Sequence, residues 1–159
     1  MALILKEQGI HAKILEMDVV RKVLTPEPTY SEEERSIVYA AIAYMAKLLS
    51  DEGVNVIVDA TGNLKKYRDV AAKLIPEFGE IYVQCPLNIC MEREAYRRGG
   101  HAPPDIYKKG IGGQSSTVPG LNVPYEVPEH PIGVVNTEKE TKEQAAAGAA
   151  NAVLQWAGQ

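Results

Sequence analysis

The sequence predicts an α/β fold in which helices cover both faces of a parallel sheet. Short β-branched runs alternate with longer segments of helical periodicity, which is the order typical of such sheets. We expect strands over residues 12–18, 54–60, 80–85 and 133–137. The run at 54–60 is almost wholly apolar, which favours a strand buried on both faces.

The clearest expected helix begins after Ser31, an N-cap candidate with Glu34 three residues later as in a capping box. Gly53 supplies its stop. Further helices are expected over 65–75, 88–98 and 142–156, and residues 1–8 are expected to be helical up to Gly9. Apolar spacing of three and four residues predicts the core stripe of the main helix as Ile37, Val38, Ala41, Ile42, Met45, Leu48 and Leu49.

The length of 159 residues with 45% hydrophobic content predicts one domain over residues 1–159. Within it, residues 99–128 are rich in glycine and proline, and a loop of this length is usually functional or disordered. Lys108 and Lys109 favour a charged lid over about 99–128, while a mobile surface excursion is the alternative.

Composition argues against several classes of partner. A net charge of −4 and a pI near 5.4 leave no basic excess for nucleic acid or an anionic membrane surface. The apolar run at the start ends at Lys6, far short of a membrane span. Cys85 and Cys90 suggest neither a disulfide framework nor a zinc site, so a cytoplasmic protein without a bound metal of its own is expected.

Polar side chains follow the expected strands, at the edge of a parallel sheet where ligands bind. Asp18 is followed by Arg21, and Arg35 lies near the start of the next helix. A carboxylate between two arginines suits an anionic substrate whose hydroxyl must be aligned or deprotonated. The alternatives are an N-cap role for Asp18 and a solvated surface position for each arginine.

Asp59 closes the apolar run of the second strand and resembles a Walker B carboxylate, which helps to hold magnesium in P-loop nucleoside triphosphatases. The alternative is that Asp59 caps the following turn, where Gly62 and Asn63 are typical turn residues.

Five collinear blocks of the sequence resemble the motifs of adenylylsulfate kinases. They cover nearly the whole chain from residue 12 onward, and their order makes the resemblance strong. The matching segments are Glu16-Met17-Asp18-Val19-Val20-Arg21 with Tyr30-Ser31-Glu32-Glu33-Glu34-Arg35, Tyr67-Arg68-Asp69, Cys85-Pro86-Leu87-Asn88-Ile89-Cys90-Met91-Glu92-Arg93, Ile106-Tyr107-Lys108-Lys109, and Val123-Pro124-Tyr125-Glu126-Val127-Pro128.

This resemblance implies transfer of the γ-phosphoryl group of MgATP to the 3′-hydroxyl of adenosine 5′-phosphosulfate (APS), a step of sulfate assimilation. It implies that Asp18 lies beside the acceptor hydroxyl as a catalytic residue. Arg21 and Arg35 would hold the phosphosulfate, and Tyr30 would stack on the acceptor's adenine.

For the nucleotide side, the resemblance implies that Lys108 and Lys109 close over the reacting phosphates, with Lys108 also catalytic. Asp59 and Arg93 would bind the MgATP cofactor, with Mg²⁺ held mainly by phosphates. The resemblance also makes a homodimer plausible.

Several positions depart from the family's pattern and put the identity of the acceptor in question. Glu16 replaces an aspartate, Val38 replaces an asparagine, and Ala60-Thr61-Gly62-Asn63 replaces Ile-Ser-Pro-Tyr. The lid also carries an unusual glycine-rich run at 110–117.

No Gly-x-x-x-x-Gly-Lys-Ser/Thr phosphate loop occurs in the sequence. We therefore expect a three-layer P-loop kinase-like fold from which the first, central strand and the P-loop are missing, as in an N-terminally truncated enzyme. The chain as written is expected to be inactive. Two alternatives stay open: a catalytically dead module that binds the acceptor, and a related P-loop kinase with a different small-molecule acceptor.

Overall fold

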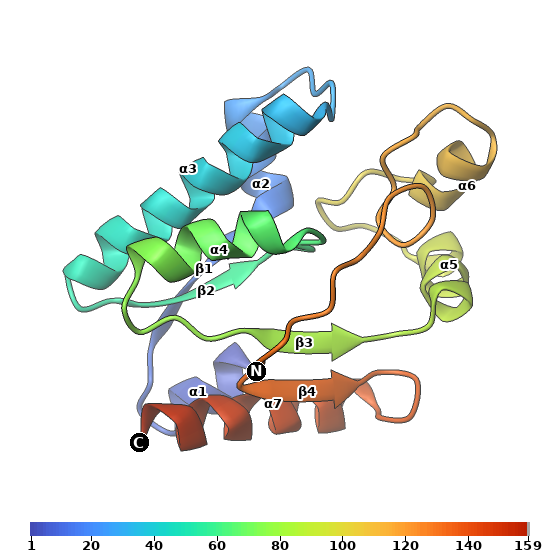
Figure 1. The fold of residues 1–159 in the computed structure, drawn as a ribbon. Helices are drawn as coiled ribbons and strands as arrows, with labels where there is room; N and C mark the ends of the chain where they lie inside the picture. Colours follow the sequence, from blue (N-terminus) through green and yellow to red (C-terminus); the bar gives the residue numbers. More distant parts are fainter. Residues whose placement is uncertain (159) are drawn as a thin grey trace.

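The computed structural model describes residues 1–158 and contains four strands in two parallel pairs (Figure 1). In the first pair β1 (Ala12–Glu16) lies beside β2 (Asn55–Asp59), and in the second β3 (Ile81–Gln84) lies beside β4 (Gly133–Asn136). The expected parallel α/β class is confirmed. Each strand is slightly shorter than expected, because polar or helical residues take over at its ends.

The two pairs do not join into one sheet, since no strand of residues 1–158 pairs with the outer edge of β2 or β3. Side chains along these strands are consequently open to solvent: Val58 is 40% exposed and Val83 is 59% exposed. The expectation that 54–60 forms a strand buried on both faces is therefore wrong. A strand covered by helices is fully buried only where both of its edges are also paired.

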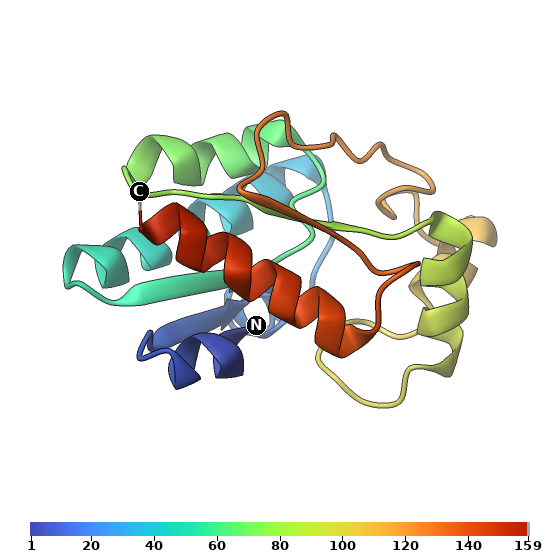
Figure 2. The same cartoon turned by 90° about the horizontal axis from the view of Figure 1, so that it is seen from below.

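Helices lie on both faces of the strands, as expected for three layers (Figure 1). Figure 2 shows α7 crossing the second strand pair, and α7 contacts β4 and α1. On the other face α3 packs on β2 and on α4, and α2 packs on β1. The helices are α1 (Ala2–Glu7), α2 (Met17–Leu24), α3 (Glu32–Asp51), α4 (Lys65–Leu74), α5 (Leu87–Tyr96), α6 (Ile106–Ile111) and α7 (Lys142–Ala157).

Two of these helices were not expected. α2 begins directly after β1, so Met17 and Asp18, assigned to the strand from sequence, are helical; burial of Met17 and Val20 explains why the chain turns inward here. α6 is a short helix inside the expected lid, and its N-cap residue, Asp105, has a left-handed φ of 57°. The lid segment is thus partly structured between its glycines and prolines.

The start of α3 confirms Ser31 as the N-cap, whose hydroxyl accepts a hydrogen bond from the Glu34 N–H at 3.2 Å. The reciprocal half of the expected capping box is not formed. The Glu34 carboxylate instead accepts hydrogen bonds from the N–H and hydroxyl of Thr29, at 2.6 and 2.7 Å, and from the N–H of Tyr30 at 3.3 Å. It therefore fixes the loop before the helix.

The buried face of α3 is rotated relative to the expected stripe. Val38 and Ile42 are buried as expected, whereas Ile37 is 61% exposed and Leu48 is 50% exposed. Alanines let α3 pack close to its neighbours, and the Tyr39 hydroxyl accepts a buried hydrogen bond from the Gly62 N–H. The buried positions missed from sequence are Tyr39, Ala43 and Ala46.

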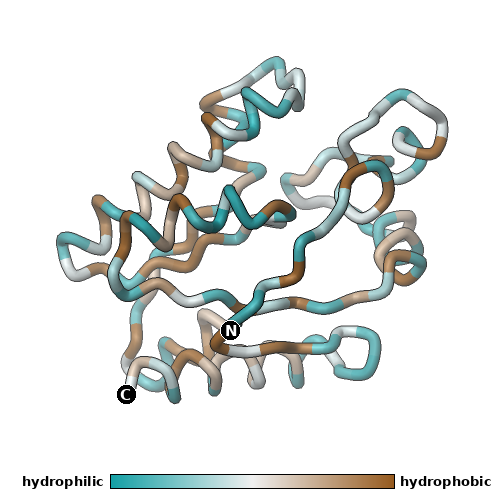
Figure 3. The backbone as a smooth tube through the Cα atoms, viewed as in Figure 1, coloured by the Kyte–Doolittle hydropathy of each residue, from teal (hydrophilic) through white to brown (hydrophobic). Residues whose placement is uncertain are grey.

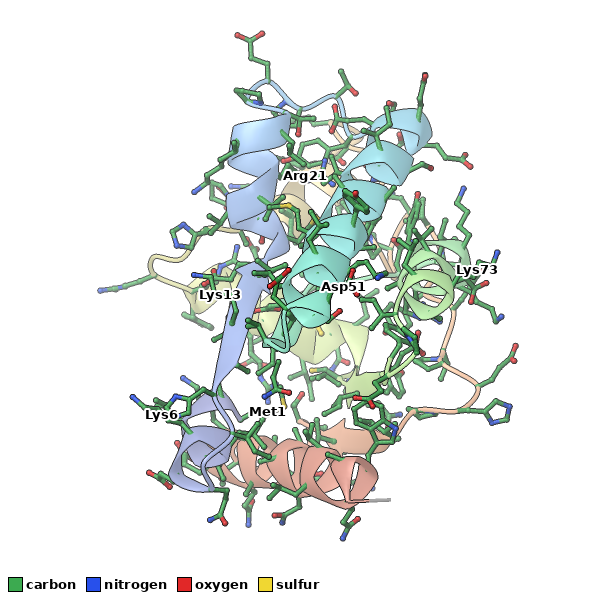
Figure 4. The ribbon with its side chains drawn as sticks, turned by 90° about the vertical axis from the view of Figure 1, so that its left-hand side faces the viewer. Met1, Lys6, Lys13, Arg21, Asp51 and Lys73 are labelled. Carbon is green, nitrogen blue, oxygen red and sulfur yellow. The ribbon has the colours of Figure 1, made fainter. Side chains whose placement is uncertain are left out.

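The strand pairs have separate hydrophobic cores, and Figure 3 shows hydrophobic residues following the strands while the turn after β4 is hydrophilic. α1 links the two halves by packing on both α7 and β1. Met1 lies next to α7 (Figure 4) and packs on the second core. The first core contains Leu15, Met17, Val20, Val38, Tyr39, Ile42, Ala46 and Tyr67, and the second contains Val135, Ala145 and Ala149.

The contact between β4 and α7 leaves no space for a side chain at Gly133. A Cβ there would lie 2.5 Å from the Ala152 Cβ, so Gly133→Ala is expected to lower the free energy of unfolding by about 1–3 kcal/mol. Urea denaturation measures this. Gly148→Ala, on the helix side of the same contact, is the control: its nearest neighbour would be a Val135 methyl at 3.4 Å, and alanine favours a helix. Equal stabilities of the two variants would contradict this packing.

Candidate active site

Three carboxylates gather where β1 and β2 end. Glu16 and Asp59 are partners in the strand register, and Asp18 lies in the first turn of α2. Partial burial raises the pKa of Asp59, and the negative charges of Glu16 and Asp18 raise it further. The concentration of like charge favours a proton-accepting role at this edge, although the three carboxylates are not placed to hold a metal ion by themselves.

The structure does not show the capping roles that the sequence left open for Asp18 and Asp59. The N-cap of α2 is Glu16 and not Asp18. Among the hydrogen bonds of residues 1–158, none involves the carboxylate of Asp18 or of Asp59, so Asp59 does not cap the turn at Gly62 and Asn63. Both carboxylates are therefore available to a ligand.

Arg21 is the most buried charged residue of the site, at 7% exposure, and lies between α2 and α3 (Figure 4). Its Nη1 donates to the Glu34 carboxylate at 2.8 Å, and its guanidinium lies 5.2 Å from the centre of the Tyr30 ring. Burial alone would raise the pKa of Glu34, but the Thr29 and Tyr30 hydrogen bonds and the Arg21 charge bring it below its ordinary value. Glu34 thus stays ionised and orients Arg21.

Arg35 also lies close to the Tyr30 ring. Its guanidinium is 5.8 Å from the Tyr30 ring centre, and its Nε donates to the Tyr30 carbonyl at 3.1 Å. Its Nη2 donates to the carbonyl and hydroxyl of Thr117, at 2.8 and 3.0 Å. Tyr30 has a left-handed φ of 55°, which is uncommon for a tyrosine, and these contacts hold it there.

The structure therefore brings together Arg21, Tyr30 and Arg35, three residues singled out from the sequence. Each guanidinium has five N–H donors, and the contacts described above leave some of them free on both arginines. Two fixed cations beside an aromatic ring can bind an anionic group attached to a flat ring, by charge-assisted hydrogen bonds and by stacking. The solvated-surface alternative does not hold for Arg21 and Arg35, because both are engaged with other segments.

The lid lysines are not part of this cluster. Lys108 and Lys109 are exposed on α6, and Lys109 Nζ donates to the Pro104 carbonyl at 3.1 Å. Within residues 1–158, no hydrogen bond joins either lysine to Arg21, Tyr30 or Arg35. In Figure 1 α6 lies beside α5, across from α2.

Arg93 belongs to a second group, at the ends of β3 and β4. Its guanidinium donates to the Thr137 hydroxyl at 3.1 Å and also to the Thr137 carbonyl, and it lies 3.5 Å from the Cys85 Sγ. Cys85, Arg93 and Tyr107 line an open cavity of about 840 Å³. Burial raises the pKa of Tyr107 to about 12, with Cys90 contributing. Arg93, on α5, therefore lies by the β3–β4 pair, whereas Asp59 ends β2 of the other pair.

Comparison with known proteins identifies the family. The family model for adenylylsulphate kinase matches residues 1–136. The chain belongs to the adenylylsulfate kinase family.

Curated relatives agree with this assignment. A probable adenylyl-sulfate kinase of Archaeoglobus fulgidus is 34% identical over 138 residues, covering 87% of this chain and 84% of the relative. One from Pyrococcus abyssi is 34% identical over 142 residues, covering 89% and 77%. A probable bifunctional SAT/APS kinase 2 of Sorangium cellulosum is also 34% identical, but the chain spans only 23% of its length.

Solved structures share the fold. The Mycobacterium tuberculosis APS kinase CysC in complex with AMPPNP and APS superposes with a TM-score of 0.76 at 26% identity, covering 99% of this chain and 86% of that one. A sugar kinase from Janibacter is similar in fold alone, with a TM-score of 0.63 at 16% identity. The expected P-loop kinase-like fold is confirmed.

Among adenylylsulfate kinases, this chain differs at positions whose surroundings are now visible. Val38 is fully buried in the first core and Asn63 is 2% exposed, so neither lies open to an acceptor. Sequence reasoning missed the contacts made by Glu34 and Thr117. Both hold an arginine of the site, yet Glu34 carried only a capping signal and Thr117 carried none.

The searched residues contain no helix long and apolar enough to cross a membrane.

Proposed function

We propose that this protein provides the acceptor side of an adenylylsulfate kinase, which transfers the γ-phosphoryl group of ATP to the 3′-hydroxyl of APS. The observation that carries the proposal is the cluster of Arg21, Tyr30 and Arg35 in a chain of this family. The related CysC structure holds an ATP analogue and APS, which supports the same pair of ligands here.

In this proposal Arg21 and Arg35 clamp the phosphosulfate, and Tyr30 stacks on the adenine. The two guanidinium groups are already oriented by Glu34 and Thr117, so little side-chain entropy is lost on binding. Asp18 orients the acceptor hydroxyl and accepts its proton, for which its uncommitted carboxylate at the strand ends is suited.

Lys108 and Lys109 are assigned to the reacting phosphates, and Lys108 is catalytic in this scheme. Because α6 lies beside α5 and across from α2, this assignment requires α6 to move toward α2 before the two lysines reach the site. Asp59 and Arg93 are assigned to the nucleotide side.

MgATP is the cofactor in this proposal, but the chain offers only part of a site for it. The 159 residues contain no phosphate-loop motif, and residues 1–158 contain no group of three or more His, Cys, Asp or Glu placed to hold a metal. Mg²⁺ would keep water and phosphate oxygens as most of its ligands. We accordingly propose that the chain by itself binds the acceptor and does not transfer phosphate.

Two finer points belong to the same proposal. A cytoplasmic location is supported by the free thiols of Cys85 and Cys90. A homodimer is supported by apolar side chains exposed along one side of α3, namely Ile37, Tyr44 and Leu48. Light scattering of the purified chain tests the second point.

A different acceptor is the second candidate, favoured by the loop after β2. Gly62 and Asn63 replace proline and tyrosine of the family pattern, and both are buried against neighbouring segments. A titration panel with APS, adenosine 5′-phosphate and a sugar phosphate distinguishes the candidates. We expect APS to bind at least about tenfold more tightly than adenosine 5′-phosphate, since the sulfate adds a second anionic group and each arginine of the pair can then hold one group. Tighter binding of the sugar phosphate than of APS would support a P-loop kinase with a different small-molecule acceptor.

A further inference from the structure

Arg68, on α4, joins three segments that are distant in sequence. Its Nη1 donates to the Gly62 carbonyl after β2 at 2.6 Å, and its Nη2 donates to the Glu126 carbonyl in the returning part of the lid at 2.8 Å. Its Nε donates to the Glu80 carboxylate, just before β3, at 3.0 Å. The Arg68 side chain is only 12% exposed. No other side chain could meet all three acceptors, because only a guanidinium presents this planar set of donors.

The returning part of the lid is bound to the loop after β2 by further hydrogen bonds. The Glu126 N–H donates to the Asn63 carbonyl at 2.7 Å, and the Asn63 Nδ2 donates to the Pro124 carbonyl at 3.0 Å. The Lys65 N–H at the start of α4 donates to the Glu126 carboxylate. We call residues 124–126 the strap.

The strap also reaches the second strand pair. Between its two anchored neighbours, Tyr125 stacks on Tyr82 of β3, with 5.7 Å between ring centres and 22° between planes. The Arg68 guanidinium lies 6.0 Å from the Tyr125 ring centre. β2 and β3 share no backbone pairing within residues 1–158. These side-chain contacts therefore connect the two strand pairs at this edge, where a continuous sheet would have backbone hydrogen bonds.

The same loop is connected to the acceptor cluster. The Gly62 carbonyl is held by Arg68, and the Gly62 N–H donates to the Tyr39 hydroxyl at 3.0 Å. Tyr39 lies on α3, one turn after Arg35. Burial raises the pKa of Tyr39 above its ordinary value, against the opposing effects of the Gly62 hydrogen bond and the Arg35 charge. The returning part of the lid is thereby fixed at two points, at Thr117 by Arg35 and at the strap by Arg68, whereas α6 has neither contact.

We infer that Arg68 is a positioning residue, which fixes the loop after β2 and the strap relative to the acceptor site. The returning part of the lid is then already in place when the acceptor binds. This inference rests on the proposed function, since it assigns Arg68 a part in acceptor binding without contact to the acceptor. Removal of the guanidinium releases the Gly62 and Glu126 carbonyls together, which loosens both the loop and the strap, while the hydrogen bonds of Asn63 to the strap remain.

The test compares Arg68→Met and Arg68→Lys with Lys73→Met, which removes an exposed charge in the last turn of α4 (Figure 4). Hydrogen exchange followed by mass spectrometry and calorimetric titration with APS are run well below each variant's Tm. Arg68→Met is expected to weaken APS binding about tenfold and to speed exchange at 61–63 and 124–127. Arg68→Lys is expected to fall between, because one ammonium group cannot reach all three acceptors, and Lys73→Met is expected to match the wild type.

If Arg68→Met does not fold, Glu80→Gln provides the second variant, since it removes the negative charge beside Arg68 and leaves the hydrogen bonds to the Gly62 and Glu126 carbonyls in place. It is expected to weaken APS binding about threefold. Unchanged APS affinity and unchanged exchange at 61–63 and 124–127 in Arg68→Met, or in Glu80→Gln in its place, would overturn the inference. If the wild type does not bind APS, the proposed function fails, and exchange at these two segments still decides whether Arg68 couples them.

Discussion

Replacing Arg21 by Met is expected to weaken APS binding by about 100-fold or more. A hydrogen bond between charged groups contributes about 1.5–3 kcal/mol, and each 1.4 kcal/mol is a factor of ten in affinity. The substitution also leaves the Glu34 carboxylate without its cation at a position that is only 12% exposed. Calorimetric titration gives the affinity, and urea denaturation gives the accompanying loss of stability.

Two further variants separate charge from geometry. Arg21→Lys keeps the positive charge but loses the planar fork, so its affinity is expected to lie nearer to that of Arg21→Met than to the wild type. Lys13→Met removes an exposed cation from β1 (Figure 4) and is the matched control. Equal APS affinities for Arg21→Met and Lys13→Met would rule out Arg21 as a ligand of the acceptor.

Adding a strand between β2 and β3 is expected to have a large effect on stability. A variant can carry, ahead of Met1, an apolar five-residue strand, a Gly-x-x-x-x-Gly-Lys-Ser loop and one helical turn leading into α1. Pairing both free edges and covering Val58 and Val83 is expected to raise the free energy of unfolding by about 3 kcal/mol or more. It is also expected to confer ATP binding, because the loop amides and lysine form a phosphate site. Urea denaturation and calorimetry measure the two effects.

The control for this variant has two prolines in the added strand, which remove backbone donors and prevent pairing. It is expected to show neither gain. If the unmodified addition leaves the stability of the chain unchanged, the gap between β2 and β3 is not a strand position.

Local sequence signals predicted most of the secondary structure. The β-branched runs located all four strands, and Ser31 with Gly53 set the limits of α3. The failures have physical causes. Nothing between Glu16 and Met17 marks a boundary, because a helix that begins directly on the last strand residue carries no turn signal. On α3, Ile37 and Leu48 fit the apolar period, yet they lie outside because alanines and Tyr39 pack more closely on α4 and the loop after β2.

The candidate site was predictable where its residues belong to ordered motifs, as Arg21, Tyr30 and Arg35 do. What could not be predicted were the contacts across long separations. Arg35 meets Thr117 across 82 positions and Arg68 meets Glu126 across 58, and neither partner has a local pattern that distinguishes it from a surface residue. Such pairings depend on the tertiary fold, in which the lid returns over the loop after β2.

The most direct test of the account is a pair of calorimetric titrations of the unmodified chain, one with APS and one with ATP. We expect saturable binding of one APS per chain and no saturable binding of ATP, because Arg21, Tyr30 and Arg35 are assembled while the sequence holds no phosphate loop. ATP binding without APS binding would contradict the proposed acceptor role.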